Sequence, residues 1–374
     1  MTKFAFSLAA LAIIAPWPAP TAFAAAPQSA GDSADAPAWL TTGVFAWKSS
    51  PPLLAADSSA AEPEVAFKDP SVVRYDGRWH LFGTHRLVSG DVDMQYLSFD
   101  DWSEIGRAPR HRLKFQDAYH CAPQVFYYSP HKKWYLIYQA VGDWPLPGAT
   151  SQTNEQPIRR MMVPAFSTTT QIDDPKSWTK PERMVVAHPA DRKQPKWIDF
   201  WVICDDESAH LFFTSDDGHF WRSATPRDAF PRGWSKPELV LHDTREELFE
   251  ASHTYKLRGC EQYLTIIEAI GDRRRYYKAW LADRLAGPWR PLAATKEKPF
   301  AAVGANVEQS PPWTMSISHG ELLRSGHDEH LEIDPDHLEF LYQGVDDEGY
   351  QGRKYGSIPW QIGLLKMVGP PGGK

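Results

Sequence analysis

The sequence predicts an all-β fold, a five-bladed β-propeller that spans residues 63–374. Short stretches with strand patterns follow one another from residue 65 onward, and no long segment has helical periodicity. Tryptophans recur in similar settings at spacings of 76, 56 and 55 residues: Trp102, Trp178, Trp234 and Trp289. The positions that open the predicted inner strands recur at spacings of 52, 78, 51 and 69 residues: Asp69, Cys121, Asp199, Glu250 and His319. Units of about 50 residues are typical of propeller blades, whereas a β-sandwich would not predict this recurrence.

The chain before the propeller has two parts. Residues 1–24 have the features of a secretory signal peptide, because an apolar stretch follows Lys3 and small residues precede a cleavage site after Ala24. The apolar stretch is shorter than the roughly 20 residues that cross a bilayer. Residues 25–62 are rich in Ala, Ser and Pro and predict a leader in which only residues 38–47 could pack. We therefore expect a secreted protein, extracellular or periplasmic, with no membrane partner.

Turn signals place a hairpin inside each of the first four blades. Asp76-Gly77, between two alternating runs, is the strongest of these signals. The other three turns are predicted at Ser129-Pro130, Asp217-Gly218 and Arg258-Gly259. A loop at residues 142–160 accounts for the long second repeat, and its Trp144 would either stack on a sugar chain or anchor the loop. The last segment, residues 356–366, is expected to pack against the first blade and close the ring.

The composition of the chain limits the classes of partner that it could bind. The chain has 374 residues with 40 basic and 47 acidic side chains, for a net charge of -7. A protein that binds a nucleic-acid backbone needs the opposite balance, so we expect no nucleic-acid partner. The 16 Trp and 14 Tyr fill cores in most proteins, but their flat faces also suit sugar rings. A neutral polymer is compatible with this composition, and nothing in it requires a second subunit, so we expect a monomer.

Three carboxylates stand at the same phase of the repeat. They are Asp69 in FKDPSVV, Asp199 in WIDFWVICDD and Glu250 in LFEASHTY. The inner strands of a propeller run along its channel, so their first residues meet at one mouth. Each acid alone could be a turn former or a surface residue, but three at one phase favour a site. Converging carboxylates are the groups that glycoside hydrolysis uses.

The neighbours of these acids suggest their roles. Glu250 is flanked by apolar residues, and burial raises the pKa of a carboxyl toward the range of a proton donor. Asp69 follows Lys68, whose charge would keep it ionised as the base. Asp199 would then orient or tune Glu250. These three residues are the predicted catalytic set.

One further acid competes for the donor role. Glu268 lies within the apolar run TIIEAIG, and a carboxyl there could donate a proton. Its position inside a strand favours a buried structural partner of Arg274 or Arg275 instead.

The residues resemble a known family, glycoside hydrolase family 62. The motifs FKDPSVV, CAPQVFYY, IDFWVICDD, LFEASHTY, YLTIIEAIG, PFAAVGANV, ISHGELLR and FLYQG occur in that family's order over about residues 65–366. The resemblance implies a five-bladed propeller with the active site at one mouth of the axis. It also implies an inverting α-L-arabinofuranosidase that acts on arabinoxylan or arabinoxylo-oligosaccharides, with Asp69 as base, Glu250 as acid and Asp199 as pKa modulator.

The same resemblance implies roles for five more residues. Four of them would contact the arabinose hydroxyls: Lys68, Arg275, Asn306 and Tyr355. His319 resembles an axial histidine near a structural Ca²⁺, although that ion prefers oxygen ligands and a lone histidine could equally be a satisfied core residue. No cofactor is expected to take part in the chemistry.

Two other functions share these features. A related five-bladed β-xylosidase or endo-arabinanase would have the same acids and a pocket of different depth. A sugar-binding propeller without turnover would keep the fold and release no product. The products released from arabinoxylan and from linear arabinan distinguish these possibilities.

Overall fold

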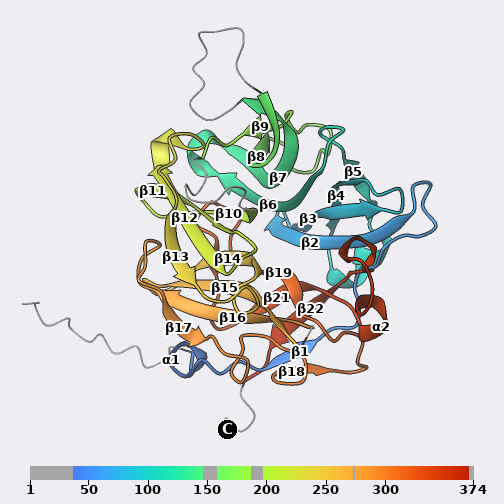
Figure 1. Ribbon diagram of the computed structural model, residues 1–374, viewed down its shortest axis with the longest axis vertical. Coiled ribbons are helices and arrows are strands. Elements are labelled where there is room, and N and C mark those ends of the chain that lie inside the picture. Colours follow the sequence, from blue (N-terminus) through green and yellow to red (C-terminus); the bar gives the residue numbers. More distant parts are fainter. Residues whose placement is uncertain (1–36, 146–157, 187–196, 273, 370–374) are drawn as a thin grey trace, which may run out of the picture. The chain divides into compact units, whose positions relative to one another are not determined.

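The computed structural model describes residues 37–145, 158–186, 197–272 and 274–369. Five sheets stand around one axis, as Figure 1 shows, so the predicted five-bladed propeller is confirmed. The predicted signal peptide, residues 1–24, lies outside the described residues. None of the helices among the described residues is long and apolar enough to cross a membrane.

The first four blades follow one another along the chain, and each begins with its innermost strand. Blade 1 contains β2 (Glu64–Tyr75), β3 (Arg78–Leu87), β4 (Val92–Phe99) and β5 (His111–Leu113). Blade 2 contains β6 (His120–Tyr128), β7 (Lys133–Pro145), β8 (Ile158–Thr169) and β9 (Glu182–Arg183). Blade 3 contains β10 (Ile198–Cys204), β11 (Ser208–Thr214), β12 (His219–Pro226) and β13 (Glu238–His242). Blade 4 contains β14 (Glu250–Leu257), β15 (Tyr263–Gly271), β16 (Arg274–Ala282) and β17 (Arg290–Ala293), with β20 (Glu332–Ile333) beside β14.

Blade 5 is assembled from both ends of the propeller, in the order β18 (Val307–Gln309), β1 (Trp47–Ser49), β22 (Gln361–Met367), β21 (Glu339–Gly344) and β19 (Ser318–Leu322). β1 pairs antiparallel with β22, and this pairing closes the ring. The prediction of a leader at residues 25–62 is corrected for residues 37–62, because the chain from residue 37 belongs to the propeller unit. Residues 25–36 lie outside the described residues. Trp47 is 1% exposed. Its indole N–H donates to Phe300 O, so the polar atom of this side chain keeps a hydrogen-bond partner inside the core.

The recurring tryptophans occupy one place in the fold. Each lies between the third and fourth strands of its blade: Trp102, Trp178, Trp234 and Trp289. The last three are 8–9% exposed. Short helical segments complete the chain: α1 (Trp39–Thr42), η1 (Trp102–Arg107), η2 (Ser129–His131), η3 (Arg227–Ala229), α2 (Asp347–Tyr350) and η4 (Tyr355–Ser357). The repeat that the sequence shows is therefore the repeat of the blades.

The hairpin signals lie at the predicted turns. Asp76 and Gly77 have φ values of 49° and 77°, as the tight turn between β2 and β3 requires. The turn at Ser129-Pro130 is longer than predicted, because η2 occupies it and Lys132 supplies the left-handed residue. β7 and β8 carry their hairpin to Pro145 and Ile158. The rest of the predicted 142–160 loop lies outside the described residues, so the role of Trp144 stays a prediction.

Apolar side chains between the blades form the core. One cluster joins blades 5 and 1 and contains Phe67, Leu81, Ile362 and Leu364. β22 thus packs against the first blade, as predicted. At the end of the channel away from the acids, the segment after β19 bonds to the last residues of three inner strands. Tyr127, Cys204 and Lys256 donate their N–H groups to carbonyls of residues 327–331. This crossing segment leaves the starts of the inner strands as the open mouth.

Candidate active site

Every inner strand carries an irregularity at the predicted phase. The pairing register shifts after Lys68, Cys121, Ile198, Glu250 and Ser318, the five first residues of these bulges. Four of the bulges contain a non-glycine residue in the left-handed region: Asp69 (φ 50°), Ala122 (52°), Asp199 (57°) and Ala251 (52°). A bulge re-aims the side chains of a strand, and strained backbone of this kind concentrates at functional sites. All three acids therefore belong to bulges, but the predicted common phase is corrected by one residue: Asp69 and Asp199 are the second residues of their bulges, whereas Glu250 is the first of its own.

Asp69 has the environment of a base. It is 3% exposed, and Lys68 Nζ lies 2.7 Å from its Oδ2. Gln343 Oε1 accepts the Asp69 backbone N–H at 2.8 Å. Burial alone would raise the pKa of Asp69, but the Lys68 ammonium and the nearby His319 hold it below the ordinary value. The carboxylate is therefore ionised throughout the neutral range.

Asp199 and Glu250 have the opposite character. Burial, reinforced by the charge of Asp69, raises the pKa of Asp199 to about 7. Burial also raises the pKa of Glu250 to about 8, because Asp199 adds to the effect and Arg275 only partly opposes it. Asp199 Oδ2 accepts the N–H of Ala251, next to Glu250, at 2.8 Å. The Glu250 side chain is 14% exposed, against 7% for Asp199 and 4% for Asp69. The acid that would donate a proton is thus the most accessible of the three.

Arg275 is placed between two acids. Its NH1 lies 3.2 Å from Glu268 Oε1 and 3.9 Å from Glu250 Oε1. Glu268 is fully buried and also accepts hydrogen bonds from Ser318 Oγ and the His319 N–H. The geometry agrees with the reading of Glu268 as a buried partner of Arg275 rather than as the donor. Tyr350, whose hydroxyl accepts a hydrogen bond from Arg275 Nε at 3.0 Å, was not expected from the sequence.

Lys68 connects the base to the rim of the mouth. Its Nζ donates to the Tyr355 hydroxyl at 3.4 Å. Tyr355 is 48% exposed and begins η4, in a segment that Arg86 ties to blade 1 through Gly356 O. Of the four predicted substrate-binding residues, the structure therefore brings Lys68, Arg275 and Tyr355 to the acids.

Asn306 does not join them, and the prediction for this residue is corrected. Its amide nitrogen donates to the carbonyls of Phe45, Pro299 and Phe300, and its Oδ1 accepts the Ala302 N–H. These bonds use the whole amide to tie its loop to the chain before β1. Asn306 is a structural residue of blade 5, and no hydrogen bond or ion pair in the described chain connects it to the acids.

His319 lies beside two of the acids, Asp69 and Asp199. Its Nδ1 is 3.4 Å from Asp69 Oδ1 and 3.9 Å from Asp199 Oδ2. Burial lowers its pKa, so the ring is neutral near pH 7. Ca²⁺ takes six to eight oxygen ligands, yet the described residues contain no group of three or more His, Cys, Asp or Glu that could hold a metal. The structural Ca²⁺ near His319 therefore stays a prediction.

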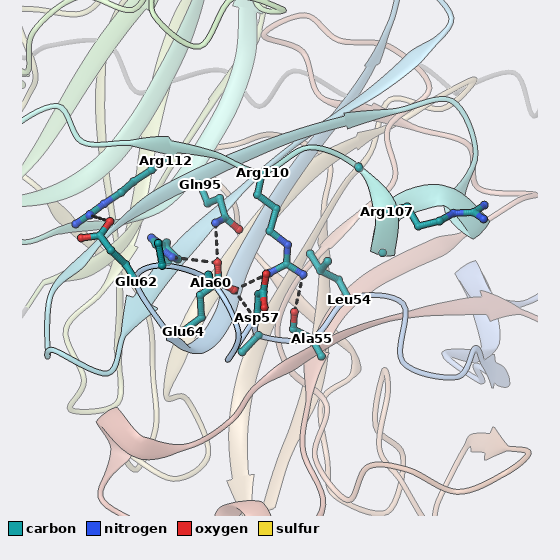
Figure 2. Close-up of a pocket in the computed structure, with 15 residues that line it drawn as sticks. Leu54, Ala55, Asp57, Ala60, Glu62, Glu64, Gln95, Arg107, Arg110 and Arg112 are labelled. Carbon is teal, nitrogen blue, oxygen red and sulfur yellow. Dashed lines mark hydrogen bonds and ion pairs between the residues drawn. The ribbon is translucent and has the colours of Figure 1, made fainter.

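A cavity of about 750 Å³ lies away from these residues, against blade 1. Figure 2 shows its lining, which includes Glu64, Gln95, Arg110 and Arg112 and none of the three acids. Arg110 pairs with Glu64 at 2.6 Å, and Arg112 pairs with Asp93 at 2.6 Å. The ionic groups on its floor are paired with one another, so the catalytic candidates remain those at the mouth.

A five-bladed propeller that gathers one ionised carboxylate and two carboxyls with raised pKa values at its mouth has the make-up of a carboxylate-dependent glycosidase. The family model described as "Glycosyl hydrolase family 62" matches residues 46–366. The chain therefore belongs to glycoside hydrolase family 62 and is a glycosidase.

Individual relatives agree with this membership. The chain is 37% identical over 327 residues to alpha-L-arabinofuranosidase C of Cellvibrio japonicus, a match that covers 86% of this chain and 47% of that protein. The chain thus spans about half the length of this curated relative.

Three solved structures are similar over almost their whole length. The catalytic domain of the Coprinopsis cinerea GH62 alpha-L-arabinofuranosidase has a TM-score of 0.77 and 38% identity, and the match covers 87% of this chain and 98% of that chain. The Podospora anserina alpha-L-arabinofuranosidase in complex with cellotriose has a TM-score of 0.76 and 34% identity, and the match covers 87% of this chain and 98% of that chain. A GH62 hydrolase in complex with xylotriose has a TM-score of 0.75 and 35% identity, and the match covers 88% of this chain and 99% of that chain.

Proposed function

We propose that this protein is a secreted α-L-arabinofuranosidase that removes arabinofuranosyl side chains from arabinoxylan. One observation supports the catalytic part of this proposal. Lys68 holds Asp69 ionised, while burial raises the pKa of Glu250 to about 8, so Glu250 is mostly protonated at neutral pH. Hydrolysis of a glycoside needs one carboxylate and one carboxylic acid at the same time. Near pH 7 this mouth supplies both.

In the proposed mechanism Glu250 protonates the glycosidic oxygen. Asp69 removes a proton from a water molecule that attacks the anomeric carbon on the opposite face, so the configuration inverts. Asp199, fixed to Ala251 N–H, disfavours ionisation of Glu250 through its own negative charge. An inverting pair leaves room for the water, with carboxyl groups about 6.5–9.5 Å apart. We expect Asp69 and Glu250 to meet that condition when substrate is bound.

Three further residues would hold the furanose. Lys68 and Arg275 are buried cations with free donor capacity facing the acids, and the Tyr355 hydroxyl lies beside Lys68. Charged donors of this kind form strong hydrogen bonds with sugar hydroxyls. The relatives bound to xylotriose and cellotriose support a β-linked sugar backbone as the neighbour of the mouth. We propose no role in the reaction for Ca²⁺; a structural ion near His319 would need water for most of its ligands.

Product analysis on arabinoxylan tests this function. We expect the parent to release free arabinose but no xylose from wheat arabinoxylan, and no oligomers from linear arabinan. Proton NMR of the first sugar released should show β-arabinose, which is the inverted product. Release of xylose would assign the protein to the β-xylosidases, and binding without release would make it a sugar-binding propeller. Early α-arabinose would reject the single displacement.

A further inference from the structure

A ring of polar residues surrounds the acids on the second strand of each blade. Each member pairs across the ladder with the first residue of its own blade's bulge. The five members are Thr84, Gln139, Thr214, Glu268 and Gln343. All are at most 6% exposed. A polar side chain this deep needs a hydrogen-bond partner, and for four of the five members that partner is in the next blade.

Four members cap the bulge of the blade that follows. Thr84 Oγ1 accepts the N–H of Ala122 at 2.8 Å, and Gln139 Oε1 accepts that of Asp199 at 3.2 Å. Glu268 Oε2 accepts the His319 N–H at 2.7 Å, and Gln343 Oε1 accepts the Asp69 N–H at 2.8 Å. A bulge takes a backbone N–H out of the sheet ladder, and a buried N–H without a partner is costly. The ring therefore holds each bulge in place from its neighbour.

The junction between blades 3 and 4 departs from this pattern. There the Ala251 N–H is accepted by Asp199 Oδ2, from the inner strand. The second-strand member, Thr214, caps nothing, and in the described part of the chain its Oγ1 has no hydrogen-bond partner. An acid has thus taken over the capping position at the one junction that borders Glu250.

Two of the caps act directly on the acids, and a third acts through a hydroxyl. Gln343 and Gln139 bind the backbone N–H groups of Asp69 and Asp199 themselves. Thr84 accepts the Ala122 N–H, and its hydroxyl helps to lower the pKa of the Asp69 carboxyl. Gln139 is in turn fixed, because its Nε2 donates to Cys121 Sγ at 3.0 Å and that thiol donates to the Tyr119 hydroxyl.

We propose that Thr84, Gln139 and Gln343 are positioning residues that hold Asp69 and Asp199 in their reactive orientation. The blade 2 bulge, which carries no acid, thereby links the two: Thr84 connects it to Asp69, and Gln139 connects it to Asp199. This inference rests on the proposed function and adds residues that act through the acids rather than on the substrate.

The ring contains its own matched control. Thr84→Val and Thr214→Val make the same chemical change at equivalent positions, but only the first removes a cap. We expect Thr84→Val to lower kcat on arabinoxylan by about 10- to 100-fold with KM nearly unchanged, because a small misplacement of a reacting group has this effect. It should also move the acidic limb of kcat/KM to higher pH, since the hydroxyl that favours ionised Asp69 is lost. Thr214→Val should leave both unchanged, and Thr84→Ser should restore the parent's values.

The outcomes distinguish failure of the proposed function from failure of the proposed positioning role. If the parent releases no arabinose, the proposed function is wrong. If the parent is active and the two valine variants have equal kcat and equal pH profiles, the positioning role is overturned. Circular dichroism and a melting curve verify folding of each variant. Should Thr84→Val not fold, Gln343→Met replaces it against Thr214→Val, with the same expected loss of kcat and the same contradicting result.

Discussion

The mouth of the propeller and the blade 1 cavity both contain a largely buried glutamate, but the pKa of Glu250 at the mouth is raised and that of Glu64 in the cavity is lowered. Glu64 in the cavity faces four donors: Arg110, His85, Gln95 and the Asp57 N–H. Against the effect of burial, these donors lower the pKa of Glu64 to about 2. Burial opposes protonation of His85, but its two carboxylate neighbours raise its pKa to about 9. This cluster is a set of satisfied ion pairs.

Glu250 at the mouth has one cation at 3.9 Å, and that cation is nearer to Glu268. At Glu64 the donors outweigh burial and keep the carboxylate ionised, whereas at Glu250 burial outweighs the single distant cation and raises the pKa. The first arrangement stabilises the fold, and the second leaves a carboxyl that can do acid chemistry near neutral pH. Asp69 is the only acid of the catalytic set whose pKa, like that of Glu64, is lowered by a neighbouring cation, which here is Lys68.

The largest expected effect comes from the same substitution in both regions. Glu250→Gln should lower kcat on arabinoxylan by about 100- to 10,000-fold, the range for loss of a general acid. Glu64→Gln should keep the parent's kcat, because it removes no group from the mouth. Steady-state kinetics on the two purified variants, with folding verified by circular dichroism, make the comparison. A folded but inactive Glu64→Gln would show that the two clusters are not separate in function.

Stability should respond in the reverse order. Glu64→Gln breaks a buried ionic network and should cost about 3 kcal/mol of unfolding free energy at pH 7. Glu250 is different, because its pKa is higher folded, about 8, than unfolded. Its favourable contribution is complete at pH 4 and is lost as the pH rises through 8. Glu250→Gln should therefore melt above the parent at pH 9, and this difference should vanish near pH 4. A parent more stable than Glu250→Gln at pH 9 contradicts the raised pKa.

The pH profile separates the two acids of the mouth. The alkaline limb of kcat/KM should fall near pH 8, where Glu250 ionises, and the acidic limb should lie below the ordinary pKa of an aspartate. Lys68→Met removes the cation that favours ionised Asp69, so the acidic limb should move to higher pH. Lys278→Met, a change of another buried lysine that pairs with Glu247, serves as the control and should not move it. An acidic limb that is the same in Lys68→Met and the parent would remove Lys68 as its cause.

The smallest effect concerns the cavity. Because the pKa of His85 is raised to about 9 on folding, its contribution to stability is complete below pH 6.5 and is lost as the pH rises through 9. Denaturant unfolding of the parent should show this loss between pH 6.5 and 9. His85→Gln should show a flatter dependence over the same interval. Equal slopes in the two proteins would mean that His85 does not carry its charge in the native state.

Part of the candidate site could be read from the chain because it is periodic. Asp69, Asp199 and Glu250 stand out since each blade repeats the same strand start, and the bulges occur at those starts. The capping ring leaves a weaker signal in the sequence: Gln139 in YLIYQA and Gln343 in FLYQG are single polar residues within apolar strands. Such a residue predicts a buried partner, but its partner belongs to another blade and cannot be identified from local sequence.

Asn306 and the start of the propeller mark the other limit. The motif around Asn306 suggested a pocket residue, yet its hydrogen bonds lie with Phe45, in a stretch expected to be a leader. β1 has only three residues, too few for a strand pattern, and it forms because β18 and β22 offer it two free edges. Contacts between segments about 260 residues apart decide both cases.

The amino-acid sequence by itself determined the number of blades, the hairpins and the acids at the strand starts, because strand periodicity, turn residues and repeats are local properties of the chain. Only the tertiary structure decided that the pKa of Asp199 is also raised, which polar residue caps which bulge and where the ring closes. Those outcomes depend on burial and on distances between blades, and both exist only once the sheets have packed around the axis.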